Sequence, residues 1–202
     1  IPNPQSPIPN PLIDKMDGEC IFMIFNEIKP NFLTLLKHTY ANYFCQTLFV
    51  KLSQELKQDI IVLIVDNLDS LIKHLISFRC IICLFKTQID DKTQEYVSQV
   101  LKSIERDIYL RHTRYLKILE AFVSIISKDK LEFAIDLVFG SLDIFIQTKQ
   151  GYFVSRKLIK HIKHPSSQYK IADYMVQQIK SLLDHSNGVL LALCLIKHFT
   201  IL

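Results

Sequence analysis

Asn42, Tyr43 and Gln46 form the group of side chains whose types and spacing are best suited to binding chemistry. Residues four positions apart share one face of an α-helix, so a helix here would place the two amides side by side, with the ring next to them. The amides could meet the edge of a nucleic-acid base while the ring stacks on it, and we expect this helix surface to be exposed. The alternative is that the amides are merely solvated and Tyr43 packs against the fold.

A second candidate is a basic stretch in the C-terminal third of the chain, where no Asp or Glu occurs between Asp143 and Asp173. Such a cluster of positive charge can neutralise phosphate groups. The alternative is an ordinary solvated helix face. The basic residues of this stretch are Arg156, Lys157, Lys160, Lys163 and Lys170.

The other reactive residues do not form a catalytic or metal-binding pattern. Cys80 and Cys83 form a single C-x-x-C among apolar residues, with no second pair at zinc spacing. His161 and His164 lie about one turn apart without a third ligand nearby in sequence. No phosphate-binding glycine loop, nucleophile elbow or zinc-protease motif occurs. We therefore predict neither an enzyme nor a metal or cofactor site.

The composition favours a helical, intracellular protein. Hydrophobic residues make up 49% of the 202 residues, charged residues 22%, and there are only four glycines. Five of the seven prolines lie in residues 1–11, which predicts a Pro-rich linker or tail over 1–16 and a helical domain over 17–202. Five cysteines in apolar stretches indicate a reducing compartment, and no apolar run reaches the roughly 18 residues of a membrane span. The net charge of +4 permits an anionic partner.

The chain repeats itself with a period of about 37 residues. The segments 151–163 and 188–199 both begin at Gly and share L-I-K-H, and the same frame starts earlier at Ala41, Ser77 and Thr113. The spacings between starts are 36, 36, 38 and 37 residues. Each unit should contain a short helix, the helix that begins at the small residue, and a longer amphipathic helix. The predicted longer helices are Ser53–Asp66, Asp91–Arg106 and Ser166–Asp184.

Helix groups of this kind cannot bury their apolar faces alone, so neighbouring units must stack on one another. The period therefore predicts an all-α solenoid of about five units and an extended monomer. The alternative is an irregular helical bundle.

The segment FNEIKPNFLTLLKHTYANYFCQTLF (25–49) resembles a repeat of the Pumilio (PUF) homology domain, in both F-N-E-I and N-Y-x-x-Q. The resemblance covers residues 17–202 as five of the family's usual eight units. It implies a right-handed superhelical solenoid of three-helix PUF-type repeats, with single-stranded RNA along the concave surface. We call the five residues of the N-Y-x-x-Q motif, 42–46, the window of this unit. In the family, the first and fifth residues of the window contact the base edge and the second stacks between bases. Asn42 and Gln46 then match the uracil-reading pair, with Tyr43 as the stacking residue.

The matching windows of the other units depart from that pattern. Arg79, Tyr115 and Phe153 could still stack on bases. Ile82, Ile118 and Leu193 cannot hydrogen-bond a base edge, and the last unit resembles a degenerate or capping unit. The four windows hold Phe78, Arg79 and Ile82; Arg114, Tyr115 and Ile118; Tyr152, Phe153 and Arg156; and Val189, Leu190 and Leu193.

These residues and the resemblance predict a sequence-selective RNA-binding protein that recognises a U-containing element in mRNA and acts on translation or mRNA decay. Regulatory proteins are possible partners, no membrane partner is expected, and the expected location is the cytoplasm. Two alternatives stay open. One is a protein-interaction scaffold that has lost base readout. The other is a nucleolar PUF-like ribosome-assembly factor that holds RNA through its backbone.

Overall fold

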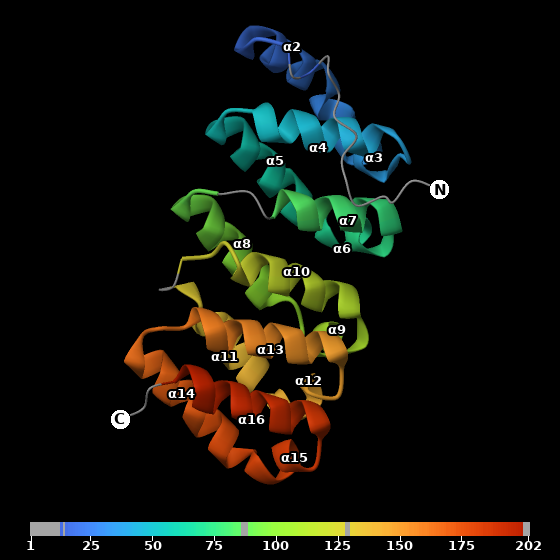
Figure 1. Cartoon of the computed structure of the whole chain (residues 1–202). Coiled ribbons are helices and arrows are strands. Elements are labelled where there is room, and N and C mark those ends of the chain that lie inside the picture. The colour runs from blue at the N-terminus through green and yellow to red at the C-terminus, as the bar shows by residue number, and fades with distance from the viewer. Residues whose placement is uncertain (1–12, 14, 86–88, 128–129, 200–202) are drawn as a thin grey trace. The chain divides into compact units, whose positions relative to one another are not determined.

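The computed structural model describes residues 13, 15–85, 89–127 and 130–199, which form helices joined by short turns, without a strand (Figure 1). The predicted all-α class is confirmed. The chain forms two compact units, residues 1–93 and 94–202, with the boundary inside a helix. The predicted tail over 1–16 lies largely outside the described residues, and Ile13 is buried.

The helices form five successive repeats, each with a long first helix, a short second helix and a third helix. The first helices are α2 (Gly18–Ile28), α5 (Gln54–Asp66), α8 (Asp91–Ser103), α11 (Glu132–Phe139) and α14 (Pro165–Gln177). The second helices are α3 (Phe32–Lys37, preceded by the 3-10 turn η1, Lys29–Asn31), α6 (Leu68–Lys73), α9 (Arg106–Arg111), α12 (Leu142–Phe145) and α15 (Ile179–Leu183). The third helices are α4 (Ala41–Lys51), α7 (Leu75–Leu84), α10 (Thr113–Val123), α13 (Lys149–His161) and α16 (Ser186–His198).

Two of the three predicted long helices are divided in the structure. The helix expected over Asp91–Arg106 ends at Ser103, because Glu105 has an extended backbone and starts α9. The helix expected over Ser166–Asp184 is interrupted at Gln178, whose side-chain Nε2 donates to the carbonyl oxygen of Phe139 at 2.8 Å. The contact that accompanies this break is therefore made with the preceding repeat.

Each third helix follows a residue that can accept a hydrogen bond from the unpaired N–H groups of its first turn. Thr148 Oγ1 accepts from the backbone N–H of Gly151 at 3.0 Å. His38 Nδ1 accepts from Ala41 N–H at 3.1 Å, and His185 Nδ1 from Asn187 N–H at 3.3 Å. His74 and His112 occupy the equivalent positions before α7 and α10, although their side chains make no such hydrogen bond. We call all five the cap residues; they are His38, His74, His112, Thr148 and His185, spaced by 36, 38, 36 and 37.

In repeats two, four and five, the third residue after the cap is a point of close approach between the third and second helices. A Cβ atom on Gly151 would lie 2.0 Å from the carbonyl oxygen of Phe145, and one on Gly188 would lie 2.1 Å from that of Leu182. Ser77 occupies this position in α7, and its hydroxyl donates to the Leu71 carbonyl at 2.7 Å. Small residues at these positions therefore let the second helix pack against the start of the third.

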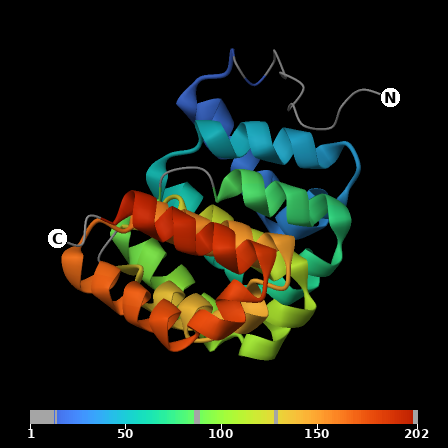
Figure 2. The ribbon, with the colours of Figure 1, turned by 60° about the horizontal axis from the view of Figure 1, so that its bottom comes forward.

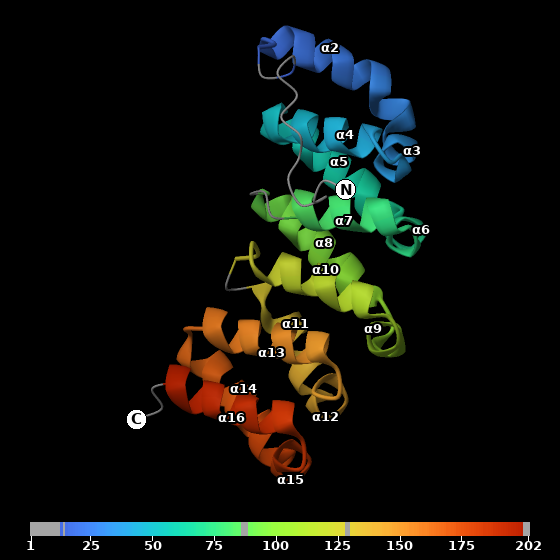
Figure 3. The same cartoon turned by 45° about the vertical axis from the view of Figure 1, so that its right-hand side comes forward.

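Within each unit the third helices lie next to one another. In the first unit α4 packs against α7, and in the second unit α10, α13 and α16 follow in order (Figures 1 and 3). Fully buried phenylalanines form much of each core, among them Phe32 and Phe49 in the first unit and Phe122 and Phe145 in the second. None of the helices in the described part of the chain has the length and apolar character needed to cross a membrane.

Candidate nucleic-acid interface

Asn42 lies inside the fold, although the sequence predicted an exposed position; that expectation is wrong for this residue. Its side chain is only 4% exposed, because it lies at the start of α4 where the preceding turn folds back. Nδ2 donates to the carbonyl oxygens of His38 at 2.9 Å and Thr39 at 2.8 Å. Oδ1 accepts from Gln46 Nε2 at 3.0 Å and lies 3.4 Å from Cys80 Sγ. The hydrogen-bonding capacity of Asn42 is therefore used within the protein.

Gln46 lies next to Asn42 as the spacing predicted, and its amide is held from two sides. Nε2 donates to Asn42 Oδ1 and, at 3.4 Å, to Cys80 Sγ on the neighbouring helix α7. The carbonyl oxygen Oε1 is the hydrogen-bonding atom that this arrangement leaves for a ligand. Tyr43, one residue after Asn42, is half-buried, so part of its ring is accessible.

Cys80 contributes to this cluster as a neutral thiol. Burial raises the pKa of Cys80 and of Cys45 to about 12, so both are protonated at neutral pH. Cys83, three residues later on α7, is exposed, and both cysteines of the C-x-x-C are free thiols. The buried thiol therefore packs against the Asn42–Gln46 pair as a weak hydrogen-bonding group.

In the window of α7, the three predicted residues differ in accessibility. Phe78 is buried at 6% exposure, Arg79 is exposed, and Ile82 is half-buried. Arg79 is therefore the most accessible of the three, and the plane of its guanidinium can stack on a base, whereas Ile82 has no group that can hydrogen-bond a base edge.

The third window begins at Leu116 in the structure rather than at Arg114. The first window residue follows the cap residue by four positions in every other repeat, and the cap of α10 is His112. Tyr115 is 5% exposed and its ring packs edge-on against Tyr109 at 6.1 Å between centroids. Tyr115 therefore occupies the position of Gly151 and is not available to stack on a base.

The corrected window of α10 brings in two residues that the sequence interpretation missed. Lys117 takes the stacking position and is exposed, and Glu120 takes the fifth position and is half-buried. Gln150, on the next third helix, donates a hydrogen bond to Glu120 Oε2. The histidine shared by the starts of α4, α7, α10 and α16 is the sequence signal that could have set this register.

The window of α13 combines aromatic rings with positive charge, as predicted. Tyr152 and Phe153 are half-buried, with ring centroids 5.6 Å apart, and Lys149 Nζ lies 5.8 Å above the Phe153 ring. Positions i, i+3, i+4 and i+7 of a helix share one face, so Phe153 and three cations form one stripe. The cations of this α13 stripe are Arg156, Lys157 and Lys160.

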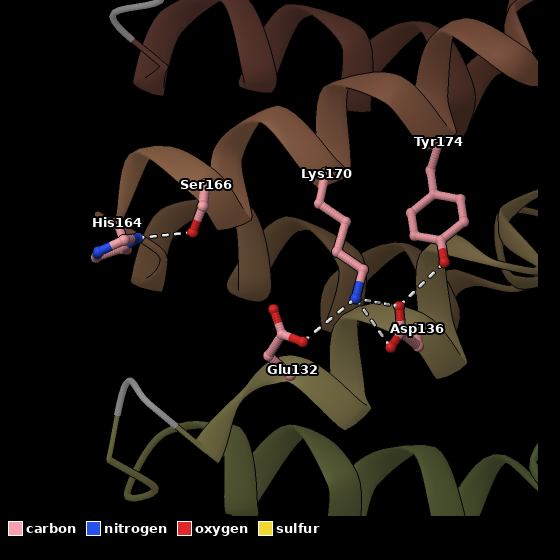
Figure 4. Close-up of polar contacts among 6 residues, drawn as sticks. All are labelled: Glu132, Asp136, His164, Ser166, Lys170 and Tyr174. Atoms are coloured by element: carbon pink, nitrogen blue, oxygen red, sulfur yellow. Dashed lines mark hydrogen bonds and ion pairs between the residues drawn. The ribbon is translucent and has the colours of Figure 1, made fainter.

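Lys163 and Lys170 do not belong to the α13 stripe. Lys163 is exposed just after the end of α13, and Lys170 lies on α14. Lys170 Nζ lies 2.8 Å from Asp136 Oδ1 and 3.4 Å from Glu132 Oε2, both on α11 (Figure 4). The hydrogen bond with Asp136 raises the pKa of Lys170. This charge is therefore paired between two first helices.

No metal ligands gather among the described residues, in that no three His, Cys, Asp or Glu side chains come together. His164 Nδ1 is 2.8 Å from Ser166 Oγ, also drawn in Figure 4. His161 is half-buried on the last turn of α13.

The window of α16 is apolar. Val189, Leu190 and Leu193 are 37%, 48% and 58% exposed. These side chains provide no hydrogen bonds for a base edge, so this helix contributes no base readout.

Solved structures share this arrangement of helices. The chain matches a Puf4 RNA binding domain bound to an HO endonuclease RNA 3′ UTR recognition sequence with a TM-score of 0.81 over 93% of its length, at 14% identity. The chain has a PUF-like fold. A Puf3 RNA binding domain bound to site A of a Cox17 RNA 3′ UTR recognition sequence matches 94% of the chain with a TM-score of 0.76, at 17% identity. The yeast Puf5p RNA-binding domain bound to SMX2 RNA matches 88% of it with a TM-score of 0.68, at 21% identity.

The chain is shorter than these PUF domains. It covers 57% of the Puf4 chain, 55% of the Puf3 chain and 50% of the Puf5p chain. No protein-family model and no curated protein matches the sequence. The PUF-like fold confirms the resemblance seen in residues 25–49. The role of each window residue depends on its burial and its contacts in this structure.

Proposed function

We propose that this chain binds single-stranded RNA along its third helices and selects a U-containing element in mRNA, and that it thereby regulates translation or mRNA decay. The PUF-like fold supports the proposal, because solved domains of this fold are described as bound to RNA. Their identity to this chain is low, so the proposal depends on the residues of the windows.

The α4 window is the observation that carries the proposal. Gln46 Nε2 is engaged by Asn42 and Cys80, and its Oε1 remains to accept a hydrogen bond beside the accessible part of Tyr43. Uracil has one donor on its Watson–Crick edge, the N3–H group, and an amide oxygen fixed in orientation can accept from it. Tyr43 offers a stacking surface for the same base.

The α13 stripe supplies the less selective part of the binding. Phe153 can stack on any base, and Arg156, Lys157 and Lys160 can neutralise phosphates. Stacking and charge without an amide at the base edge favour affinity over sequence selectivity in this repeat.

A competition assay with RNAs that differ at single positions tests the proposal. Wild type should prefer uracil at one position, and Gln46→Ala should reduce that preference by about 1–3 kcal/mol, the range of a good base-edge contact. Tyr43→Ala should weaken binding regardless of base identity. Gln58→Ala is the matched control, because Gln58 is a half-buried glutamine on the first helix α5 of the same unit. Equal affinity of wild type for all four bases at every position would reject base reading.

The regulatory part of the proposal needs a separate measurement. A reporter mRNA that carries the selected element should be translated less or decay faster when the protein is present. A matched reporter with the uracil replaced should be unaffected. Equal behaviour of the two reporters would contradict the regulatory role and leave the RNA contact intact.

A protein-binding scaffold is the second candidate function, and the α16 window favours it. Its exposed Val189, Leu190 and Leu193 resemble the apolar centre of a protein interface more than a surface for RNA. If wild type binds no single-stranded RNA at low salt, the scaffold becomes the better description.

A further inference from the structure

The motif L-I-K-H, which the sequence repeats at 158–161 and 195–198, lies at the ends of two neighbouring helices. Its Lys and His are in the last turn of α13 in the first copy and of α16 in the second. The two helices pack against each other and end on the side where α14 begins (Figures 1 and 2). The connection from α13 to α14 adds one more Lys and one more His. We call these six residues the basic edge; they are Lys160, His161, Lys163, His164, Lys197 and His198.

The side chains of the basic edge are accessible and carry positive charge without acidic partners. All of them are exposed except His161, which is half-buried. Within the part of the chain that the structure describes, no ion pair involves any of the three lysines. Lys170 on α14 differs, because it is paired with two carboxylates of α11 (Figure 4). The lysines of the basic edge therefore remain available to an anionic ligand.

Helix stability explains only part of this charge. The dipole of a helix favours cations in its last turn, which accounts for the Lys and His of the two motif copies. Lys163 and His164 instead precede the first turn of α14, where the dipole disfavours cations and no acidic residue is present. Gln168 Nε2 donates to the carbonyl oxygen of Ile162 at 3.2 Å, which links this connection to α14. The positive charge of Lys163 is therefore not explained by the stability of either helix.

The α13 stripe leads from the window of α13 to the basic edge. Phe153 belongs to this window, Arg156 and Lys157 follow it toward the end of the helix, and Lys160 belongs to both the stripe and the edge. From Phe153 to the end of α13 is about 12 Å along the helix axis. The window of the next third helix, α16, is apolar. A polyanion that reaches α13 therefore meets positive charge along this helix and none in the window of α16.

We propose that an RNA segment flanking the selected element leaves the row of windows at α13 and follows this helix to the basic edge, which binds its phosphates. The inference rests on the proposed function, because it takes single-stranded RNA to lie on the windows. It adds a binding site that reads no sequence, since phosphate contacts position a strand without information about its bases.

Short and extended RNAs test the proposal in fluorescence anisotropy titrations. The short RNA spans only the windows, and the extended RNAs add a flank without uracil at the 5′ or the 3′ end. One of these flanks should raise the affinity of wild type by about five- to thirtyfold at low salt, as two or three exposed ion pairs would. It should also steepen the slope of log affinity against log salt by about 1.4–2. A flank whose phosphates are replaced by uncharged methylphosphonates should give no gain.

Charge reversal at the basic edge should remove the gain from the flank. Lys163→Glu with Lys197→Glu should abolish it and change the affinity for the short RNA little, because neither lysine belongs to a window. Lys163→Arg with Lys197→Arg should keep the gain, since the charge is retained. The matched control is Lys102→Glu with Lys180→Glu, which makes the same change in net charge at exposed positions of α8 and α15 and should also keep it.

The outcomes separate this inference from the proposed function. No gain from either flank in wild type, an equal gain from the methylphosphonate flank, or an equal loss in the two Glu variants would overturn the basic edge as a phosphate site. A flank gain in wild type that is lost only in the Lys163 and Lys197 variant would support the basic edge, even if the short RNA showed no uracil preference. That last result would reject base reading alone.

Discussion

Asn42 and Gln46 differ in the hydrogen-bonding atoms that they leave for a ligand. The Asn42 amide is engaged within the protein, whereas Gln46 leaves its Oε1 atom. The sequence alone does not distinguish these two roles. The helical spacing correctly predicted that the two amides are neighbours, because it is a local property of an α-helix. Cys80, which approaches both amides, lies 38 residues after Asn42. Burial of Asn42 depends on that long-range packing and on the fold-back at His38, so the pattern N-Y-x-x-Q does not reveal it. We assign Asn42 to positioning Gln46.

Substitutions at the two amides should therefore affect different properties. Asn42→Ala should lower the free energy of unfolding by about 1–3 kcal/mol, because two backbone carbonyls and the Gln46 amide lose a buried partner. Gln46→Ala should cost less stability and remove uracil preference directly. Urea unfolding measures the first effect, with the exposed Asn26→Ala on α2 as control. An Asn42→Ala protein as stable as wild type would contradict the positioning role.

At the scale of helices, the period of the sequence predicted the five three-helix repeats, and most window positions follow from the same period. The repeat alignment places the third window two residues too early, because it aligns Thr113 with the small residues that begin the other third helices. In the structure Tyr115 holds that position, with its ring against Tyr109 rather than over the second helix. A small side chain is needed only where the second helix comes as close as it does at Gly151 and Gly188. The distance between the second helix and the start of the third is set by tertiary packing, which a sequence pattern does not reveal. The cap histidine is a local sequence signal that indicates where the third helix begins.

Two glycine-to-alanine substitutions should therefore have different effects on stability. Gly188→Ala would place a Cβ atom 2.1 Å from the Leu182 carbonyl oxygen, so α15 and α16 must separate, at a cost of about 1–3 kcal/mol. Gly18→Ala is the control: nothing lies within 4 Å of its Cβ position, and alanine favours a helix. Chemical denaturation of both variants measures the difference. If Gly188→Ala were as stable as Gly18→Ala, the close approach of α15 to α16 would be wrong.

At the scale of the whole molecule, the net charge of +4 conceals a difference between the two units. Residues 1–93 contain nine Lys and Arg against ten Asp and Glu, whereas residues 94–202 contain fifteen against ten. The second unit also carries the α13 stripe, and the first carries the α4 window with its ordered amides. Electrostatic attraction for RNA should therefore come mainly from the second unit, and base selectivity mainly from the first.

This division predicts how RNA affinity responds to salt. Each phosphate neutralised on a single strand contributes about 0.7 to the slope of log affinity against log salt, because bound counterions are released. Lys157→Glu with Lys160→Glu should lower that slope by about 1–1.5 and weaken all RNA sequences about equally, since phosphates carry no sequence information. The matched control is Lys102→Glu with Lys180→Glu, which makes the same change in net charge at exposed positions of α8 and α15 in the same unit. Fluorescence anisotropy titrations over a range of salt concentrations measure both slopes. Equal losses of slope in the two double variants would show that net charge, and not the α13 stripe, attracts the RNA. An unchanged slope in both would exclude the second unit from the phosphate path.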